Sequence, residues 1–148
     1  MLSDTGVPFE SAAQREAHAR LRPMLESLYP GLVRERIHAI GYVMTIDGTT
    51  LTCTLAPWAD DETTLGIRTY LAGAVSMTAE VLRELARWTT ELRFGVFGVD
   101  TADNVYIEYQ LVPSTMTEAS LARSVREVLA QEAERHDEFR SRFGGSDL

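Results

Sequence analysis

The fold is decided by residues 69–112, which read TYLAGAVSMTAEVLRELARWTTELRFGVFGVDTADNVYIEYQLV. This stretch divides into a strand-like run, a helical run and two further strand-like runs. Thr78 is the expected N-cap of the helical run, and Glu80 places negative charge in its first turn, where the helix dipole favours it. Apolar residues recur here at helical spacing, namely Val81, Leu82, Leu85, Ala86, Trp88 and Leu92. The pattern predicts one amphipathic helix of about four turns.

Two strand-like runs follow this helix and are joined by the polar turn 100–103. In the first run, Phe94 and Val96 alternate with Gly95 and Phe97. In the second run, an apolar set alternates with a more polar one. The apolar set is Val105, Ile107, Tyr109 and Leu111, and the other set is Tyr106, Glu108 and Gln110. Such alternation is typical of half-buried antiparallel strands. A helix followed at once by a hairpin with one apolar face predicts that the helix packs on the sheet.

Working outward toward the N-terminus, a helix is expected from Ser11, its possible cap, to about Tyr29. Pro23 interrupts this helix, because proline lacks a backbone donor, so the segment is either one kinked helix or two short ones. Residues 1–10 carry no periodicity and are expected to be flexible.

Three strands are expected between the first two helices. Residues 36–46 are apolar on both alternating faces and predict a strand buried on at least part of both sides. The Asp47-Gly48 pair after it is a strong hairpin signal. The return strand alternates Leu51, Cys53 and Leu55 with Thr50, Thr52 and Thr54, and a third strand carries Leu65, Ile67, Thr69 and Leu71 on one face.

The C-terminal segment predicts a long helix, opened by a capping box of Thr115 and Glu118 and ended by Gly144 and Gly145. The tail 144–148 is expected to be flexible. The expected element order is α-β-β-β-α-β-β-α, with five strands. The 148 residues suit a single domain, here 11–143.

Composition limits the partners and the compartment. The net charge of −8, from 14 basic and 22 acidic residues, argues against nucleic acid, because phosphate binding needs a basic face. Apolar runs stay well short of the roughly 18–20 residues that cross a bilayer, and the first residues do not form a signal peptide. The single Cys53 is compatible with a reducing compartment and, within an alternating strand, is expected to be an inert core thiol. We therefore expect a cytoplasmic protein that does not bind membranes.

The sequence gives little sign of catalytic or metal chemistry. The histidines His18, His38 and His136 fall in three separate elements, without ligands at metal-binding spacing. Acidic runs at 60–62 and 100–104 are expected to be solvated loop charge rather than cation sites. Gly95 and Gly98 lie in a strand, and close approach of a neighbour explains them better than a phosphate loop. No cofactor, no metal and no enzymatic activity are expected.

Four aromatic residues are the candidate binding residues: Trp58, Tyr70, Trp88 and Tyr106. Aromatic side chains supply much of the binding free energy at interfaces. Tyr70 and Tyr106 fall on the strand faces opposite the apolar set. The alternative is that these rings cover the sheet beneath the flanking helices.

The segment from Thr63 to Phe139 resembles bacterial proteins of the YbjN family, which are similar in fold to type III secretion chaperones. The resemblance rests on a strand and helix leading to an aromatic-Gly-x-aromatic strand at Arg93–Phe97, a second hairpin strand at Val105–Val112, and a C-terminal helix opened by Thr-x-x-Glu. It covers about residues 35–143. Family members often carry Asn before the short strand, where this chain has Trp88, Thr89 and Thr90.

The resemblance implies an α+β fold, with a five-stranded, mainly antiparallel sheet packed against helices. It also implies a non-enzymatic, chaperone-like protein that binds a protein or peptide client and forms a homodimer. The alternative is a regulatory or structural subunit with one fixed protein partner. An enzyme would instead need a concave pocket where titratable groups converge.

Overall fold

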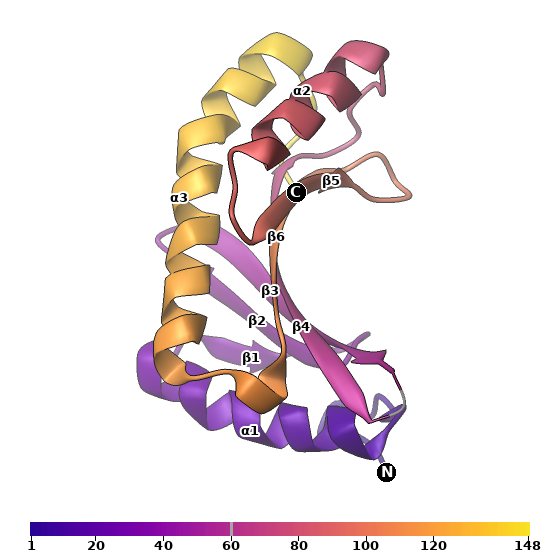
Figure 1. Ribbon diagram of the computed structural model, residues 1–148, viewed down its shortest axis with the longest axis vertical. Helices are drawn as coiled ribbons and strands as arrows, with labels where there is room; N and C mark the ends of the chain where they lie inside the picture. Colours follow the sequence, from indigo (N-terminus) through magenta and orange to yellow (C-terminus); the bar gives the residue numbers. More distant parts are fainter. Residues whose placement is uncertain (60) are drawn as a thin grey trace. The chain divides into compact units, whose positions relative to one another are not determined.

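The computed structural model describes residues 1–59 and 61–148 (Figure 1). Its helices are α1 (Ala12–Leu28), α2 (Ala79–Thr90), the short 3-10 helix η1 (Pro113–Thr115) and α3 (Glu118–Phe143). Its strands are β1 (Val33–Glu35), β2 (Gly41–Ile46), β3 (Thr49–Trp58), β4 (Glu62–Ala72), β5 (Gly95–Val99) and β6 (Val105–Leu111). The predicted α+β class is confirmed.

The sheet has six strands in the order β1-β2-β3-β4-β6-β5, one more than the five predicted. The extra strand is β1, which pairs antiparallel with β2 from Val33↔Met44 to Glu35↔Tyr42. The strand predicted at 36–46 begins only at Gly41, because residues 36–40 form the loop of this hairpin. The edge strand β1 was not predicted, because Arg34 and Glu35 do not form an apolar alternation. The predicted strand started too early, because the apolar residues Ile37 and Ile40 lie in the loop.

The Asp47-Gly48 hairpin is confirmed between β2 and β3. Asp47 has φ 50° and Gly48 has φ 84°, and positive φ at both positions of a two-residue turn suits the twist of the flanking strands. On β3, the predicted inward set Leu51, Cys53 and Leu55 is at most 2% exposed.

Side-chain caps set the helix starts. Ser11 Oγ accepts a hydrogen bond from Gln14 N at 3.0 Å, and α1 then continues as one helix through Pro23. Thr78 Oγ1 accepts one from Val81 N at 3.2 Å and opens α2.

The capping box predicted for the third helix is wrong by two residues. Thr117 Oγ1 accepts from Ser120 N at 3.0 Å, and Ser120 Oγ accepts from Thr117 N at 2.9 Å. Pro113 opens a separate 3-10 turn that takes up Thr115, so α3 starts later than predicted. At the other end, Gly144 has φ 74° and its N–H bonds Arg140 O at 3.0 Å, which is the expected glycine stop.

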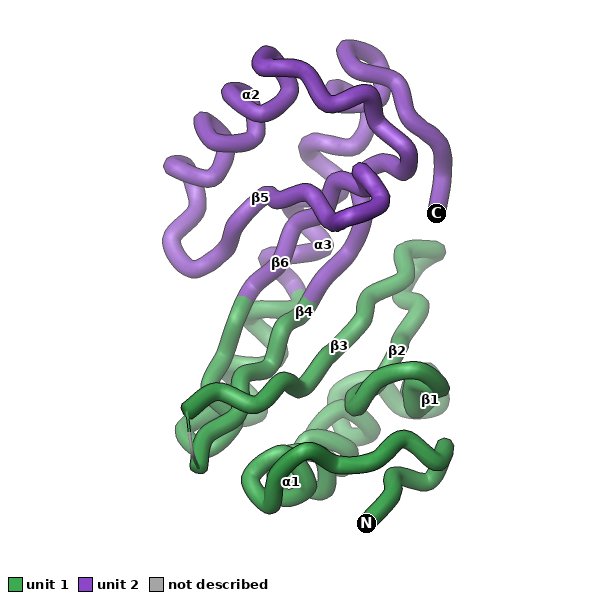
Figure 2. The backbone as a smooth tube through the Cα atoms, turned by 90° about the vertical axis from the view of Figure 1, so that its right-hand side faces the viewer, with its two compact units in different colours: residues 1–67, 110–125 green, residues 68–109, 126–148 purple. Residues whose placement is uncertain are grey.

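The chain divides into two compact units, coloured separately in Figure 2. Unit 1 comprises residues 1–67 and 110–125, and unit 2 comprises residues 68–109 and 126–148. The core of unit 1 is built from α1, the first strands and the start of α3, and includes Leu21, Leu25, Met44, Leu51, Leu65 and Leu121, none of them exposed.

The core of unit 2 forms around Trp88 of α2, which is 0% exposed. Its ring meets Phe97 of β5 edge-on at 5.5 Å and Phe139 of α3 at 6.1 Å. Thr89 also bonds the outer edge of β5: its Oγ1 accepts from Phe97 N at 2.9 Å and donates to Phe97 O at 3.5 Å. These contacts hold α2 beside β5 (Figure 1).

The two ends of the chain, which were expected to be flexible, make specific contacts within their own units. Thr5 Oγ1 donates to Arg36 O at 2.7 Å in unit 1, and a bridge joins Leu2 to Pro8. In unit 2, Gly73 N donates to Ser146 O at 2.7 Å.

Candidate functional site

The strands of unit 2 have one buried face and one open face. Thr69, Leu71, Val105, Ile107 and Tyr109 are at most 5% exposed and point into the core. Side chains alternate across a strand, so Arg68 and Tyr70 on β4, and Tyr106 and Glu108 on β6, lie on the opposite face, where they are half-buried.

Arg68 and Tyr106 are packed against each other on this open face. The Arg68 guanidinium lies 3.6 Å from the centroid of the Tyr106 ring, and its Nε donates to Glu108 Oε2 at 2.6 Å. Burial lowers the pKa of Arg68, but Tyr70 and Glu108 raise it by more. The charge is therefore fixed over the aromatic ring.

Tyr70 is held from two sides. Its ring meets Tyr106 edge-on, with centroids 6.1 Å apart, and its hydroxyl donates to Asp100 Oδ2 at 3.3 Å. Burial raises the pKa of Asp100, but bonds from the Asn104 and Ala102 N–H groups, the Asn104 amide and Tyr70 outweigh it, so that pKa lies below its ordinary value. Asp100 thus remains an acceptor at neutral pH and orients the Tyr70 ring.

Each glycine of the FGVFG run on β5 lies beneath a tyrosine of β6. Gly98 pairs with Tyr106 and Gly95 with Tyr109. A Cβ at Gly98 would stand 2.6 Å from the Tyr106 ring, and one at Gly95 would stand 2.2 Å from the Tyr109 ring. The prediction that a neighbour approaches these glycines closely is confirmed.

Val96 extends the same open face onto β5. It pairs with Glu108, so the two side chains share a face, and it is 45% exposed. We call the set Arg68, Tyr70, Val96, Tyr106 and Glu108 the tyrosine face. Sequence reasoning found only its two tyrosines, although Arg68 and Glu108 stand in the same alternating sets.

The other two aromatic candidates have different surroundings. Trp88 is a core residue and is not exposed for binding: it faces the sheet from α2, with the Arg135 guanidinium 4.8 Å from its ring centroid. The alternative stated above, a ring covering the sheet beneath a helix, holds for Trp88. Trp58 ends β3 in unit 1 and is 55% exposed.

Metal-binding side chains do not converge in the part of the chain that the structure describes, where no group of three or more His, Cys, Asp or Glu residues could hold an ion. Asp100 and Asn104 bond each other within the β5–β6 turn. Asp60, part of the acidic run 60–62, lies outside the described residues.

Within the described ranges, none of the helices has the length and apolar character needed to span a bilayer.

Among solved structures, the fold is similar to the Yersinia pestis type III secretion chaperone SycH, solved in complex with a stable fragment of YscM2. The TM-score is 0.55 at 17% sequence identity, and the match covers 80% of this chain and 98% of that one. At this identity the likeness concerns the fold alone. The three long helices and the sheet therefore define the class: an α+β domain of the type III secretion chaperone type.

The family is defined by sequence. A family model described as T3SS (YopN, CesT) and YbjN peptide-binding chaperone 1, TY-Chap1, matches residues 38–148. The chain belongs to this family of peptide-binding chaperones, and the resemblance stated above is confirmed. A comparison with curated proteins finds no match.

Proposed function

We propose that this chain is a non-enzymatic bacterial chaperone of the YbjN type that works in the cytoplasm and holds an extended client segment on the tyrosine face. The observation that carries the proposal is the packing of Arg68, Tyr70 and Tyr106 on an open sheet surface. Tyrosine and arginine are among the side chains that most often dominate binding free energy. Their mutual contacts also mean that little side-chain freedom is lost when a client docks.

The chemistry of the face favours a polypeptide client. Arg68 and Glu108 already satisfy each other, so a client does not have to neutralise an isolated charge. The two tyrosine rings and Val96 offer apolar surface to the alternating side chains of an extended segment. The overall charge of −8 favours clients with basic residues and disfavours nucleic acid.

The test is binding of the full chain to an array of short peptides of random sequence. Tyr106→Ala should weaken binding by about tenfold or more, since it removes the central ring of the face. Ile37→Ala is the matched control, because Ile37 is 66% exposed in unit 1 and lies outside the tyrosine face. Trp58→Ala measures whether the exposed tryptophan contributes.

Three outcomes of the array experiment distinguish the proposed function from its alternatives. Binding by the wild type that Tyr106→Ala reduces and Ile37→Ala does not supports the tyrosine face. Equal binding by both variants places the client elsewhere. Absence of peptide binding, with one host protein recovered repeatedly on capture, favours the alternative of a subunit with one fixed partner.

The homodimer is part of the same proposal. Phe94, just before β5, is 79% exposed, and Leu82 on α2 is 52% exposed. Apolar side chains of this size in unit 2 suit a second copy of the chain. Light scattering should give twice the mass of one chain, and Phe94→Ser should lower it toward the monomer, whereas a monomeric wild type contradicts the dimer.

A further inference from the structure

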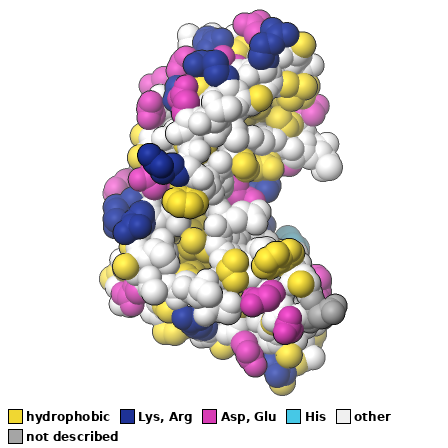
Figure 3. Space-filling view, viewed as in Figure 1, with side chains coloured by type: hydrophobic (Ala, Val, Ile, Leu, Met, Phe, Trp, Pro, Cys, Tyr) yellow, Lys and Arg dark blue, Asp and Glu magenta, His cyan; other side chains and the backbone are white. Residues whose placement is uncertain are grey.

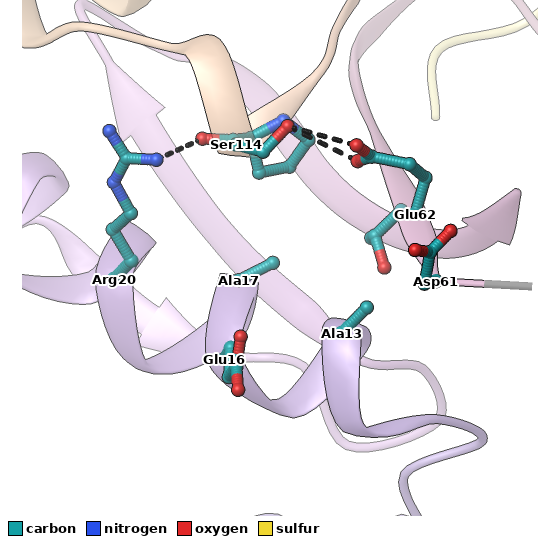
Figure 4. Close-up of a pocket in the computed structure, with 9 residues that line it drawn as sticks. Ala13, Glu16, Ala17, Arg20, Asp61, Glu62 and Ser114 are labelled. Atoms are coloured by element: carbon teal, nitrogen blue, oxygen red, sulfur yellow. Dashed lines mark hydrogen bonds between the residues drawn. The ribbon is translucent and has the colours of Figure 1, made fainter.

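Unit 1 contains a concave region that shares no residue with the tyrosine face. It is a pocket of about 270 Å³ bounded by α1, the start of β4 and η1. Figure 3 shows acidic side chains gathered at the start of β4 and on the neighbouring part of α1. Figure 4 shows the pocket in detail.

One face of α1 forms the floor. Ala13, Glu16, Ala17 and Arg20 line the pocket and follow each other at helical spacing. The methyl groups of Ala13 and Ala17 point toward the space between α1 and β4 (Figure 4). Two alanines one turn apart leave an apolar recess where larger side chains would fill the volume.

Carboxylates outnumber cations around this recess. Glu16, Asp61 and Glu62 line it, against the single guanidinium of Arg20. Glu62 accepts hydrogen bonds from Ser114 Oγ at 3.2 and 3.3 Å. Glu16 and Asp61 have no ion-pair partner among the described residues.

Arg20 keeps its positive charge but forms no ion pair with these carboxylates among the described residues, because its donors are engaged elsewhere. Its Nη1 donates to Pro113 O at 2.5 Å and its Nη2 donates to Met116 O at 2.8 Å. These bonds direct the guanidinium to the backbone around η1, as Figure 4 shows for the first of them. The carboxylates of Glu16 and Asp61 are left for another cation.

Thr63 supplies an independent sign of a ligand. It lines the pocket, it is only 2% exposed, and its Oγ1 has no hydrogen-bond partner within residues 1–59 and 61–148. A buried hydroxyl without a partner is unfavourable, and few are left so in native proteins. A donor entering the pocket would satisfy it.

We infer that this pocket binds the basic side chain, lysine or arginine, of a polypeptide held by the chaperone. The apolar recess at Ala13 and Ala17 takes the methylene stem, Glu16 and Asp61 balance the charge, and Thr63 Oγ1 accepts an N–H bond. This assignment rests on the proposed function, and it places the expected preference for basic clients in one pocket. An anion is disfavoured by the carboxylates.

The test follows methyl and backbone NMR signals of the full chain during titration with Nα-acetyl-lysine methylamide. Nα-acetyl-norleucine methylamide is the control ligand, since it has the same stem without the ammonium group. Saturable shifts at Ala17 and Thr63 are expected with the lysine derivative and not with the norleucine derivative. Equal shifts from both, or no saturable shift, overturn the inference.

Substitutions of the pocket residues test whether the lysine derivative binds in this pocket. Thr63→Val should weaken binding of the lysine derivative by about threefold to tenfold, while Thr63→Ser retains the hydroxyl and should bind like the wild type. The pair Glu16→Gln and Asp61→Asn should weaken it by about tenfold or more, because both free carboxylates are lost. Glu127→Gln, at an exposed position of α3 in unit 2, is the control, and it removes one negative charge where the paired variant removes two. Equal affinity in all variants overturns the site.

The peptide array separates failure of this inference from failure of the proposed function. Peptides that bind the chain while the lysine derivative does not bind refute the pocket alone. If the lysine derivative binds with the stated variant dependence while the array stays empty, the proposed function fails and the pocket stands as a site for basic groups.

Discussion

At the scale of single residues, the glycines of β5 are explained by the rings above them. Gly95 and Gly98 have no positive φ that would require glycine, so their backbone conformation does not account for them. Each instead leaves room for the tyrosine on the paired residue of β6, Tyr109 or Tyr106. The two tyrosines differ in burial, and this difference predicts different costs of substitution.

Gly95→Ala should destabilise the protein by about 1–3 kcal/mol, because the new methyl group collides with the middle of the Tyr109 ring, which is 5% exposed and cannot move away. Gly98→Ala should cost less than about 1 kcal/mol, because the new methyl group meets the far end of the Tyr106 ring, which is only half-buried. Urea unfolding of both variants measures the difference. Equal costs would contradict the packing.

Cys53 is confirmed as a core thiol. It is 0% exposed on β3, and burial raises the pKa of its thiol to about 12. The native protein should therefore resist thiol reagents at pH 8, and the thiol should react fully once the chain is unfolded in urea. Rapid labelling without denaturant would contradict the burial.

At the scale of elements, the sequence predicted those whose signals are local. The Asp47-Gly48 turn, the Ser11 and Thr78 caps and the alternation of β3 each act within a few residues, and each prediction is confirmed. Edge strand β1 was missed because its charged residues pair across the hairpin without an apolar pattern.

The candidate site could be predicted only in part, because some of its features depend on residues that are far apart in the chain. Alternation placed Tyr70 and Tyr106 on the polar side of their strands, and they do meet there. The burial of Trp88 depends on Phe97 and Phe139, which come from two other elements. The pocket above α1 depends on residues about fifty and one hundred positions away in the chain, and spacing along one segment carries no signal for it.

Helices α2 and α3 are joined by a carboxylate between two arginines. Glu84 of α2 accepts from Arg87 Nε at 3.1 Å and from Arg142 Nη1 of α3 at 3.0 Å. Arg87 contributes most to lowering the pKa of Glu84, Arg142 lowers it further, and the value is about 2 despite the opposing effect of burial.

This ion pairing predicts an acid dependence of stability. The folded-state pKa of Glu84, about 2, lies below its ordinary 4.5, so its contribution is complete above pH 4.5 and is lost as the pH falls toward 2. Glu84→Gln should cost up to about 1 kcal/mol at pH 7 and weaken the fall in stability across that range. Thermal unfolding from pH 7 to pH 2 measures both. Glu127→Gln is the control, and an unchanged acid profile in Glu84→Gln would contradict the assignment.

At the scale of the whole molecule, three elements contribute residues to both units: β4, β6 and α3. Neither unit can lose its structure without breaking a strand ladder or a helix that continues into the other. We therefore expect the chain to unfold as one cooperative system.

The two tryptophans allow this expectation to be tested. Trp58→Phe leaves Trp88 as the sole tryptophan, a reporter of the unit 2 core. Its fluorescence in urea should change with the same midpoint as the far-UV circular dichroism of the whole chain. Separate midpoints would mean that the two units unfold independently.

The resemblance to YbjN proteins and secretion chaperones supplied what residue patterns alone could not. Periodicity gave the element order, but the neighbouring position of β6 between β4 and β5 is a property of the complete chain. Such long-range pairing leaves no mark at short sequence distance, so no strand order was predicted; the resemblance supplied the chaperone class.

The hydroxyl of Thr89 has a consequence for solubility. Phe97 sits in the middle of the terminal strand, and both of its main-chain polar groups are occupied by that one hydroxyl. An extended strand of another molecule could not hydrogen-bond to Phe97 at this free edge of β5. It would have to displace α2 before it could add to the sheet. A chaperone of this peptide-binding family is thereby shielded from growing into β-linked polymers.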